Sequence, residues 1–310
     1  MADRPLPRSG GNRFLAVPNP DIQFVSSGAV VLDCALGGGW PLGRIVNIVG
    51  DKSTGKTLLA IEACANFARQ YPTGSIWYAE TEAAFDDKYA ASLGLPLDRI
   101  KFVKGLATVE ELHRRLTKAA EFKGPSLFVV DSLDALSDEA EMEREIGEGS
   151  YGTGKAKQMS EMLRRLAGGV ADANMLLMIV SQVRSNIGVT FGRATTRSGG
   201  RALDFYASQV LFLAHLKNEK RTINKVERVT GVRIKAKVDK NKIGLPLREC
   251  EFSIRFGFGI DDERASVEWL KSVGFHEEDV AKYSPADLKD QVCRKWAEIE
   301  TSFLPTRRKY

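Results

Sequence analysis

The sequence predicts an α/β protein built on a mostly parallel central sheet. Short runs of consecutive apolar residues alternate with stretches of helical periodicity, and one such run leads into a glycine-rich segment ending in Gly-Lys-Thr. Continuous apolar strands that alternate with helices indicate a parallel sheet covered on both faces. The 310 residues, 43% of them hydrophobic, suffice for one large α/β domain with a small appendage.

The chain is expected to divide into three parts. Residues 1–20 are rich in Pro, Gly and Arg and predict a flexible arm. Residues 21–262 carry the alternating pattern and predict the core. Residues 263–310 predict a small C-terminal helical domain with a basic tail.

Two kinds of periodicity locate the elements of the core. The apolar runs predict buried strands at Ile45–Val49, Ile76–Ala79, Leu127–Val130 and Leu176–Val180. Helical patterns predict helices at Thr57–Gln70, Val109–Phe122 and Lys155–Ala173. Alternation with a period of two, from Val232 to Val238 and from Phe252 to Phe256, predicts two antiparallel strands separated by Gly244-Leu245-Pro246.

Composition sets limits on compartment and chemistry. The four cysteines, Cys34, Cys64, Cys250 and Cys293, lie far apart in the sequence and form no CxxC pair, which favours free buried thiols in a reducing cytoplasm. No apolar leader and no run of membrane-spanning length are present, so we expect a cytoplasmic location without a membrane. The formal net charge of +5 does not by itself indicate a nucleic-acid partner.

The glycine-rich segment fits the GxxxxGK[ST] pattern of a phosphate-binding loop. Its strand and helix flanks are the required ones, because backbone N–H groups and a helix N-terminus must face the phosphates. The pattern predicts ATP and Mg²⁺ as cofactors, with Lys56 at the β- and γ-phosphates and Thr57 donating its hydroxyl oxygen to the metal. The loop comprises Gly50, Asp51, Lys52, Ser53, Thr54, Gly55, Lys56 and Thr57; the alternative is an ordinary glycine-rich turn.

Carboxylates follow two of the predicted strands. Asp131 ends an apolar strand and suits a magnesium site, although such an Asp can also be a helix N-cap. Glu80 and Glu82 follow the strand Ile76–Ala79, at the edge where α/β proteins bind ligands. Either could orient the attacking water, or act as a helix N-terminal carboxylate, and spacing alone does not choose between them.

Two segments interrupt the strand–helix rhythm. Residues 145–154 contain four glycines, and Gln182–Gly200 contains arginines and a phenylalanine but no acidic residue. Such loops suit a nucleic-acid backbone and its bases; a lid over the nucleotide or a mobile surface loop is the alternative. Lys217–Lys242 holds ten basic and three acidic residues, which indicates a solvated face or an edge that contacts phosphates.

Over residues 21–262 the chain resembles the RecA family. The resemblance lies in the segment leading into the phosphate loop (residues 27–46), in Thr81–Tyr89, in Val129–Ser132, in the glycine-rich segments with their flanks, and in Val238–Ile243. The short Pro-rich arm and compact C-terminal part differ from bacterial members, and favour a divergent relative such as a phage-encoded one.

The resemblance implies roles for particular residues. It selects Glu82 over Glu80 as the water-activating carboxylate, and places Asp86 and Tyr89 at the adenine. Gln182 would sense the γ-phosphate, and Lys240 and Lys242 would reach the ATP of a neighbouring subunit. The implied DNA-binding residues are Ile146, Gly147, Tyr151, Arg184, Ile187, Gly188, Val189, Phe191, Arg193, Arg197, Gly199 and Gly200.

The function implied is ATP-dependent homologous recombination. Subunits would polymerise on single-stranded DNA as a helical homo-oligomeric filament, hydrolyse ATP at their interfaces and exchange strands with homologous duplex DNA. Two alternatives remain: a hexameric helicase or motor on the same core, and a non-hydrolysing DNA-binding recombination mediator.

Overall fold

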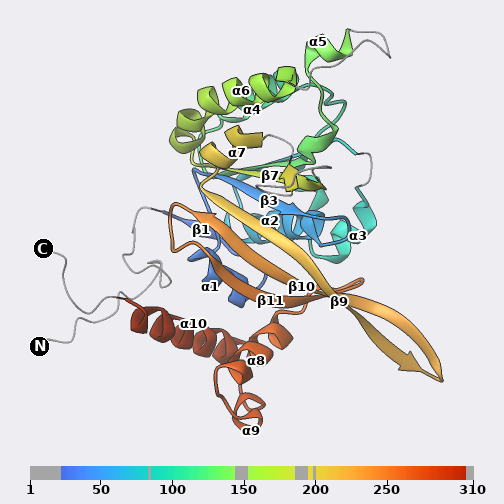
Figure 1. The fold of residues 1–310 in the computed structure, drawn as a ribbon, viewed down its shortest axis with the longest axis vertical. Coiled ribbons are helices and arrows are strands. Elements are labelled where there is room, and N and C mark those ends of the chain that lie inside the picture. The colour runs from blue at the N-terminus through green and yellow to red at the C-terminus, as the bar shows by residue number, and fades with distance from the viewer. Residues whose placement is uncertain (1–21, 83–84, 144–152, 186–194, 198–199, 305–310) are drawn as a thin grey trace, which may run out of the picture.

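The computed structural model describes residues 22–82, 85–143, 153–185, 195–197 and 200–304, and shows a large central sheet with helices on both faces (Figure 1). The strands of the sheet lie in the order β12 (Gly259–Ile260), β11 (Arg248–Arg255), β10 (Val226–Asn241), β9 (Gln209–Ile223), β3 (Ile45–Gly50), β7 (Met175–Ser185), β6 (Ser126–Asp131), β4 (Ser75–Glu80) and β5 (Ile100–Val103). The predicted arm at residues 1–20 and the basic tail lie outside the described residues.

The parallel half of the sheet confirms the predicted α/β class. Its strands are β3 (Ile45–Gly50), β4 (Ser75–Glu80), β5 (Ile100–Val103), β6 (Ser126–Asp131) and β7 (Met175–Ser185). All four predicted strands are among them. The unpredicted β5 has four residues at the sheet edge, too few to establish a period.

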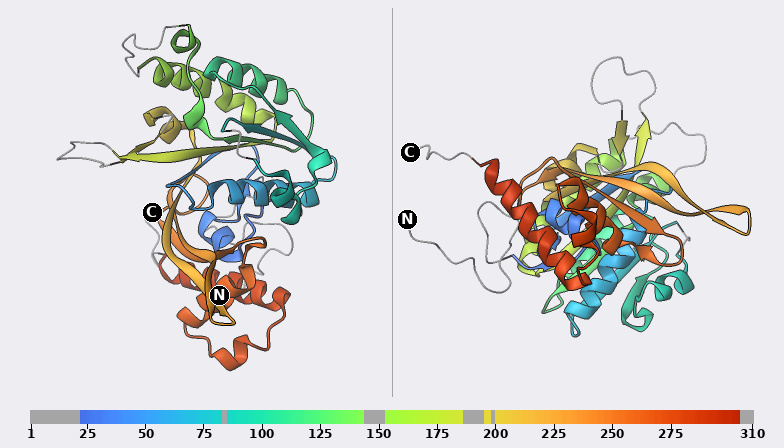
Figure 2. Two further views of the ribbon diagram at one scale, coloured as in Figure 1. Left: turned by 90° about the vertical axis from the view of Figure 1, so that its right-hand side faces the viewer. Right: turned by 90° about the horizontal axis from the view of Figure 1, so that it is seen from below.

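Helices cover the two faces of this half unequally (Figure 2). One face packs α2 (Lys56–Gln70) into the larger hydrophobic cluster, which also includes α1 (Val30–Leu36), a helix that contacts the antiparallel half of the sheet. The other packs α4 (Val109–Ala119), α6 (Thr153–Asp172) and α7 (Gly200–Tyr206) into a second cluster. Short elements complete the core: β1 (Phe24–Val25), β2 (Trp40–Pro41), α3 (Asp87–Ser92), α5 (Glu139–Met142) and β8 (Thr195–Arg197).

The antiparallel half is larger than the sequence predicts. The two expected strands are present as β10 (Val226–Asn241) and β11 (Arg248–Arg255), followed by β12 (Gly259–Ile260). An unpredicted strand, β9 (Gln209–Ile223), joins both halves, because it pairs parallel with β3 and antiparallel with β10. Its outer residues are exposed on both faces and therefore lack apolar alternation.

Three C-terminal helices gather at one end of the molecule (Figure 1). They are α8 (Asp262–Ser272), α9 (Glu277–Val280) and α10 (Pro285–Ser302). The rings of Trp269 and Trp296 stack with centroids 5.3 Å apart, and Leu270 and Val292 belong to the same hydrophobic cluster as α1. Among the described residues, no helix is both long and apolar enough to span a membrane.

The four cysteines are free and buried, as predicted. Although they are distant in sequence, Cys34 on α1, Cys250 on β11 and Cys293 on α10 lie in one hydrophobic cluster, with Cys34 and Cys293 in hydrogen-bonding contact. Burial raises the pKa of the Cys34, Cys64 and Cys250 thiols well above the usual range, so these thiols stay protonated near neutral pH.

Candidate functional site

The loop between β3 and α2 curls tightly around its own backbone. Ser53 and Gly55 both have positive φ, 59° and 85°. The Thr54 hydroxyl donates to the Asp51 carbonyl oxygen over 2.8 Å, and Lys56 Nζ donates to the same oxygen over 2.6 Å. A Cβ on Gly50 would lie 2.5 Å from Thr54 Oγ1, so the first glycine allows this closure. The N-terminus of α2 therefore faces a compact loop over which the Lys56 amine is folded.

Asp131 lies beside this loop at the carboxyl end of β6. The residue is only 9% exposed, and its carboxylate accepts a hydrogen bond from the Tyr78 hydroxyl over 2.9 Å. Burial raises the pKa of Asp131, the Glu82 charge adds to the rise, and hydrogen bonds from Thr57 and Tyr78 oppose it. The structure thus brings together the Thr57 hydroxyl and the Asp131 carboxylate, two oxygen ligands of the kind Mg²⁺ prefers.

Glu82 and Gln182 face each other across the same sheet edge. Gln182 Nε2 donates to Glu82 Oε1 over 3.1 Å, and the Ser132 hydroxyl donates to the same oxygen. Burial lowers the pKa of Lys56, and the charges of Asp131 and Glu82 oppose this lowering. Lys56, Asp131 and Glu82 are therefore close enough to interact electrostatically.

Gln182 also connects this cluster to the phosphate-loop strand. It lies beside Gly50 in the β3–β7 register. Its backbone N–H donates to Asp134 Oδ2 over 2.7 Å. Gln182 is thus held through its backbone N–H by Asp134 and through its side chain by Glu82.

Sequence reasoning missed several supporting residues. Thr81 holds Ser132 in place, because its hydroxyl donates to the Ser132 carbonyl over 2.6 Å and accepts from the Ser132 N–H over 2.9 Å. A Cβ on Gly55 would lie 2.3 Å from Ile254 Cδ1, so β11 reaches the phosphate loop. The alternating pattern around Ile254 indicates only a strand, so no sequence signal identifies this contact.

Asp86 and Tyr89 lie at the start of α3. Asp86 is its N-cap and accepts from the Tyr89 N–H over 3.0 Å. Tyr89 is half-buried; burial raises the pKa of its hydroxyl, and the charge of Glu62 on α2 adds to the rise. The structure therefore places the Tyr89 ring beside the helix that begins at the phosphate loop.

Lys240 and Lys242 contact α7 rather than this cluster. Both amines donate to the Phe205 carbonyl oxygen, over 2.9 and 3.0 Å, and Lys240 also donates to that of Asp204. Lys242 Nζ lies 5.5 Å from the centre of the Phe205 ring, a side chain that is 67% exposed. The two cations thus satisfy the carbonyl end of α7, where the helix dipole favours positive charge.

Only part of the expected DNA-binding set can be placed. β7 continues past the sheet and pairs antiparallel with β8, with Val183 opposite Arg197 and Arg184 opposite Thr196. Gly200 begins α7, so the second glycine-rich segment leaves from β7 and returns through β8 to that helix. The following lie outside the described residues: Ile146, Gly147, Tyr151, Ile187, Gly188, Val189, Phe191, Arg193 and Gly199.

A strand–loop–helix phosphate site at the carboxyl edge of a central parallel sheet defines the P-loop class of nucleotide-binding proteins. Within that class, the chain matches the RecA N-terminal domain over residues 13–261. The chain therefore belongs to the RecA family.

Curated relatives agree with this assignment. The chain is 35% identical to the RecA protein of Synechococcus sp. (strain WH7803) over 263 residues, which are 85% of this chain and 67% of that protein. It is 38% identical to RecA of Prochlorococcus marinus (strain MIT 9211) over 242 residues, 77% of this chain and 63% of the relative. For RecA of Synechocystis sp. (strain ATCC 27184 / PCC 6803 / Kazusa) the identity is 38% over 250 residues, 80% and 68% of the two chains. The matched region thus spans about two thirds of the length of these relatives.

Proposed function

We propose that this protein is an ATP-dependent recombinase that assembles on single-stranded DNA as a helical filament and hydrolyses ATP between adjacent subunits. The observation that carries the proposal is the contact between Gln182 and Glu82, 3.1 Å long. It joins a carboxylate beside the phosphate loop to the strand that leads into the second glycine-rich segment.

ATP would bind with its phosphates against the loop 50–57. Lys56 would exchange its contact with the Asp51 carbonyl for the β- and γ-phosphates. Thr57 and Asp131 would hold Mg²⁺, which supplies electrostatic stabilisation of the transferred phosphoryl group. Glu82 would orient the attacking water and accept its proton, a role that requires an ionised carboxylate near the γ-phosphate.

Gln182 would couple the nucleotide to DNA. In the structure its amide is bonded to Glu82, so a γ-phosphate that attracts this amide would release the carboxylate for water. A shift of Gln182 would be passed along β7 to the paired β7–β8 segment and to α7. The γ-phosphate would thereby order Gln182 and the segment that follows it, which is an order–disorder type of switch.

Lys240 and Lys242 would serve the site of the neighbouring subunit. They sit at the end of α7, the helix that follows the second glycine-rich segment. When a neighbouring ATP is present, its phosphates would compete with the α7 carbonyls for these amines. Turnover would then require assembly, because each site is completed by another subunit.

The test is ATP turnover with and without single-stranded DNA, with electron micrographs of the same samples. We expect turnover to rise with DNA and helical filaments to form. DNA-independent turnover with closed rings would favour a hexameric motor. DNA binding without turnover, in a protein whose Lys56→Ala variant binds DNA equally well, would favour a non-hydrolysing mediator.

A further inference from the structure

The outer part of the β9–β10 hairpin stands away from the rest of the molecule (Figures 1 and 2). β3 pairs with β9 only from residue 209 to 213, and β11 pairs with β10 only from residue 231 to 238. No other strand of the described chain pairs with residues 217–230, here called the ribbon tip. Every side chain from residue 220 to 230 is exposed.

The ribbon tip carries positive charge that its own carboxylates do not neutralise. It contains five basic and two acidic residues. Glu219 pairs with Arg264 of α8 over 2.8 Å, and Glu227 pairs with Lys220 over 2.8 Å. The remaining cations form no ion pair with a carboxylate of the described residues: Lys217, Arg221, Lys225 and Arg228.

The arrangement of these cations opposes folding rather than favouring it. Arg221 lies directly opposite Arg228 in the hairpin register, and like charges in that position destabilise strand pairing. On the same face follows the opposed pair Ile223 and Val226, 55% and 48% exposed. At the turn, Lys225 has a φ of 65°, a left-handed backbone conformation that has a lower conformational free energy for glycine than for lysine. An anionic partner accounts for the first two features, since it would neutralise the arginines and cover the apolar pair.

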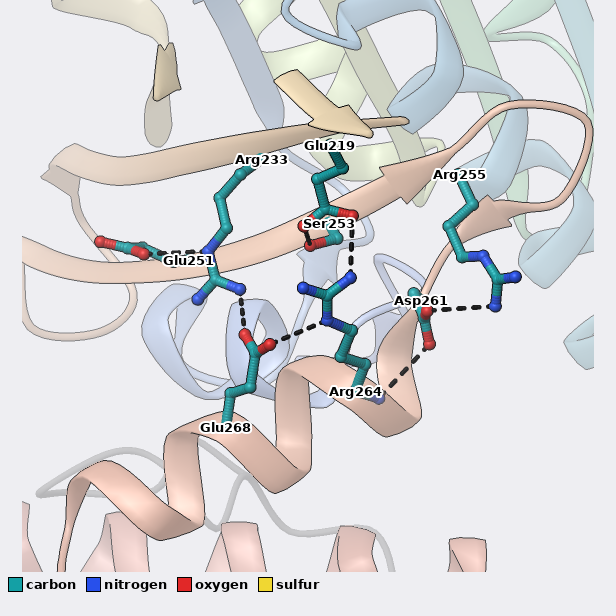
Figure 3. Close-up of polar contacts among 8 residues, drawn as sticks. All are labelled: Glu219, Arg233, Glu251, Ser253, Arg255, Asp261, Arg264 and Glu268. Carbon is teal, nitrogen blue, oxygen red and sulfur yellow. Dashed lines mark hydrogen bonds and ion pairs between the residues drawn. The ribbon is translucent and has the colours of Figure 1, made fainter. Parts of the chain in front are cut away.

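The root of the hairpin, which includes Glu219 at the inner end of the ribbon tip, is held firmly, so the rest of the tip projects in a fixed direction. Glu219 accepts hydrogen bonds from Ser253 of β11 over 2.7 Å and from Arg264 over 2.8 Å (Figure 3). Arg264 also bonds Glu268 over 2.8 Å, and Glu268 in turn pairs with Arg233 of β10. This continuous network of ion pairs fastens the hairpin root to α8.

We propose that the ribbon tip binds the phosphate backbone of duplex DNA through Arg221 and Arg228, apart from the two glycine-rich segments. A two-stranded ribbon fits the major groove of B-DNA, and a duplex is the densest polyanion a recombinase meets. Residues 217–230 include no aromatic side chain, so the tip lacks the stacking platform typical of single-strand binding. The inference deepens the proposed function and rests on it for the choice of DNA as partner.

The experiment measures duplex binding by the full chain, without nucleotide, over a range of salt concentrations. Arg221→Ala combined with Arg228→Ala should lower the slope of log affinity against log salt by roughly 2, and weaken binding at low salt by about tenfold or more. Arg221→Lys with Arg228→Lys should retain the slope. A matched control is Arg114→Ala with Arg165→Ala, two arginines on α4 and α6 that are 64% and 63% exposed.

The possible outcomes separate this inference from the proposed function. An unchanged slope in the Arg221/Arg228 variant overturns the inference, as does an equal loss of single-strand affinity, or displacement of the duplex by polyglutamate at equal charge concentration. A lowered slope supports it even if the protein proves not to hydrolyse ATP.

The variant with both Arg221 and Arg228 replaced by Ala should melt at or above the melting temperature of the unmodified protein, because it removes a like-charge pair. A lower melting temperature would contradict the argument that this pair destabilises the hairpin.

Discussion

At the residue scale, the carboxylate of Glu82 is the group on which hydrolysis should depend. Glu82→Gln keeps the size of the side chain and an oxygen that can accept from Ser132. We expect it to retain ATP binding and to slow turnover by about 10²- to 10⁴-fold, since it removes a proton acceptor. Steady-state turnover and equilibrium nucleotide binding measure the two effects.

Glu80→Gln is the matched control for this change. Glu80 is the last residue of β4 and lies opposite Asp131 in the sheet register. Turnover by Glu80→Gln should stay within a few-fold of the unmodified protein. A large loss there, with normal turnover by Glu82→Gln, would transfer the role to Glu80.

Asp33 should give the stability of the protein a distinct pH dependence. Burial raises its pKa to about 6 against hydrogen bonds from Ser26 and Ser27 that lower it. Between the unfolded value of 3.8 and about 6, the folded state binds more protons than the unfolded state. The free energy of unfolding should therefore fall as pH rises through this window, by up to about 3 kcal/mol from this group.

Asp33→Asn tests this expectation, because the amide keeps an acceptor for the Ser27 N–H and cannot ionise. Denaturant unfolding at several pH values should show a flatter profile and higher stability at neutral pH. The exposed Asp98→Asn should reproduce the unmodified profile. A fall of the free energy of unfolding with pH that is as steep in Asp33→Asn as in the unmodified protein would show that other buried carboxylates, such as Asp131 or Asp262, dominate.

Much of the candidate site could be predicted because its residues lie at the ends of strands that the sequence marks by apolar runs. Lys56, Thr57 and Asp131 follow from a loop pattern and an apolar run. The choice of Glu82 needed the family resemblance, since two carboxylates follow one strand. Asp134 and Ile254 could not be predicted, because their contacts depend on how separate elements pack.

At the scale of elements, α10 should be held mainly by its aromatic contact. Trp296 is 6% exposed and stacks on Trp269 of α8. Trp296→Ala should lower the free energy of unfolding by about 3–5 kcal/mol, or detach the C-terminal helices before the core melts. Calorimetry distinguishes one transition from two. Phe303→Ala, at a site 78% exposed, should change stability by less than about 0.5 kcal/mol.

The elements themselves were predictable where burial was continuous. β3, β4, β6 and the first part of β7 are mostly apolar and buried, so their apolar runs stood out in the sequence. β9 was missed because it is buried only at its beginning and stands in solvent beyond residue 213. A strand stabilised chiefly by pairing with its hairpin partner leaves no hydrophobic pattern to detect.

At the scale of the whole molecule, the position of Lys240 and Lys242 predicts complementation between two inactive variants. Lys240→Ala with Lys242→Ala should bind ATP but lose most DNA-stimulated turnover. Lys56→Ala should lose its own site yet still supply both lysines. In an equal mixture, each head-to-tail contact pairs two subunits at random. A site is complete only where the lysine-deficient variant supplies the phosphate loop and the Lys56→Ala variant supplies the two lysines, so turnover should return at about a quarter of the sites.

The mixing experiment can also contradict the proposal that Lys240 and Lys242 complete the site of a neighbouring subunit. If the two variants remain inactive together at every ratio, while each still binds DNA, Lys240 and Lys242 act on their own subunit or only stabilise α7. Restoration that follows the product of the two fractions would identify a shared site. Mixing Lys56→Ala with Glu82→Gln is the control, because both changes fall on the same side of the interface and should give no recovery.

The burial of every native thiol has a practical consequence for watching this molecule at work. Cys34, Cys64, Cys250 and Cys293 are all shielded from solvent. A maleimide dye should therefore react almost solely with a cysteine introduced on the surface, for example Thr222→Cys on the exposed hairpin. One label per subunit, placed without removing any natural residue from the core, would report in real time when the hairpin meets a second molecule.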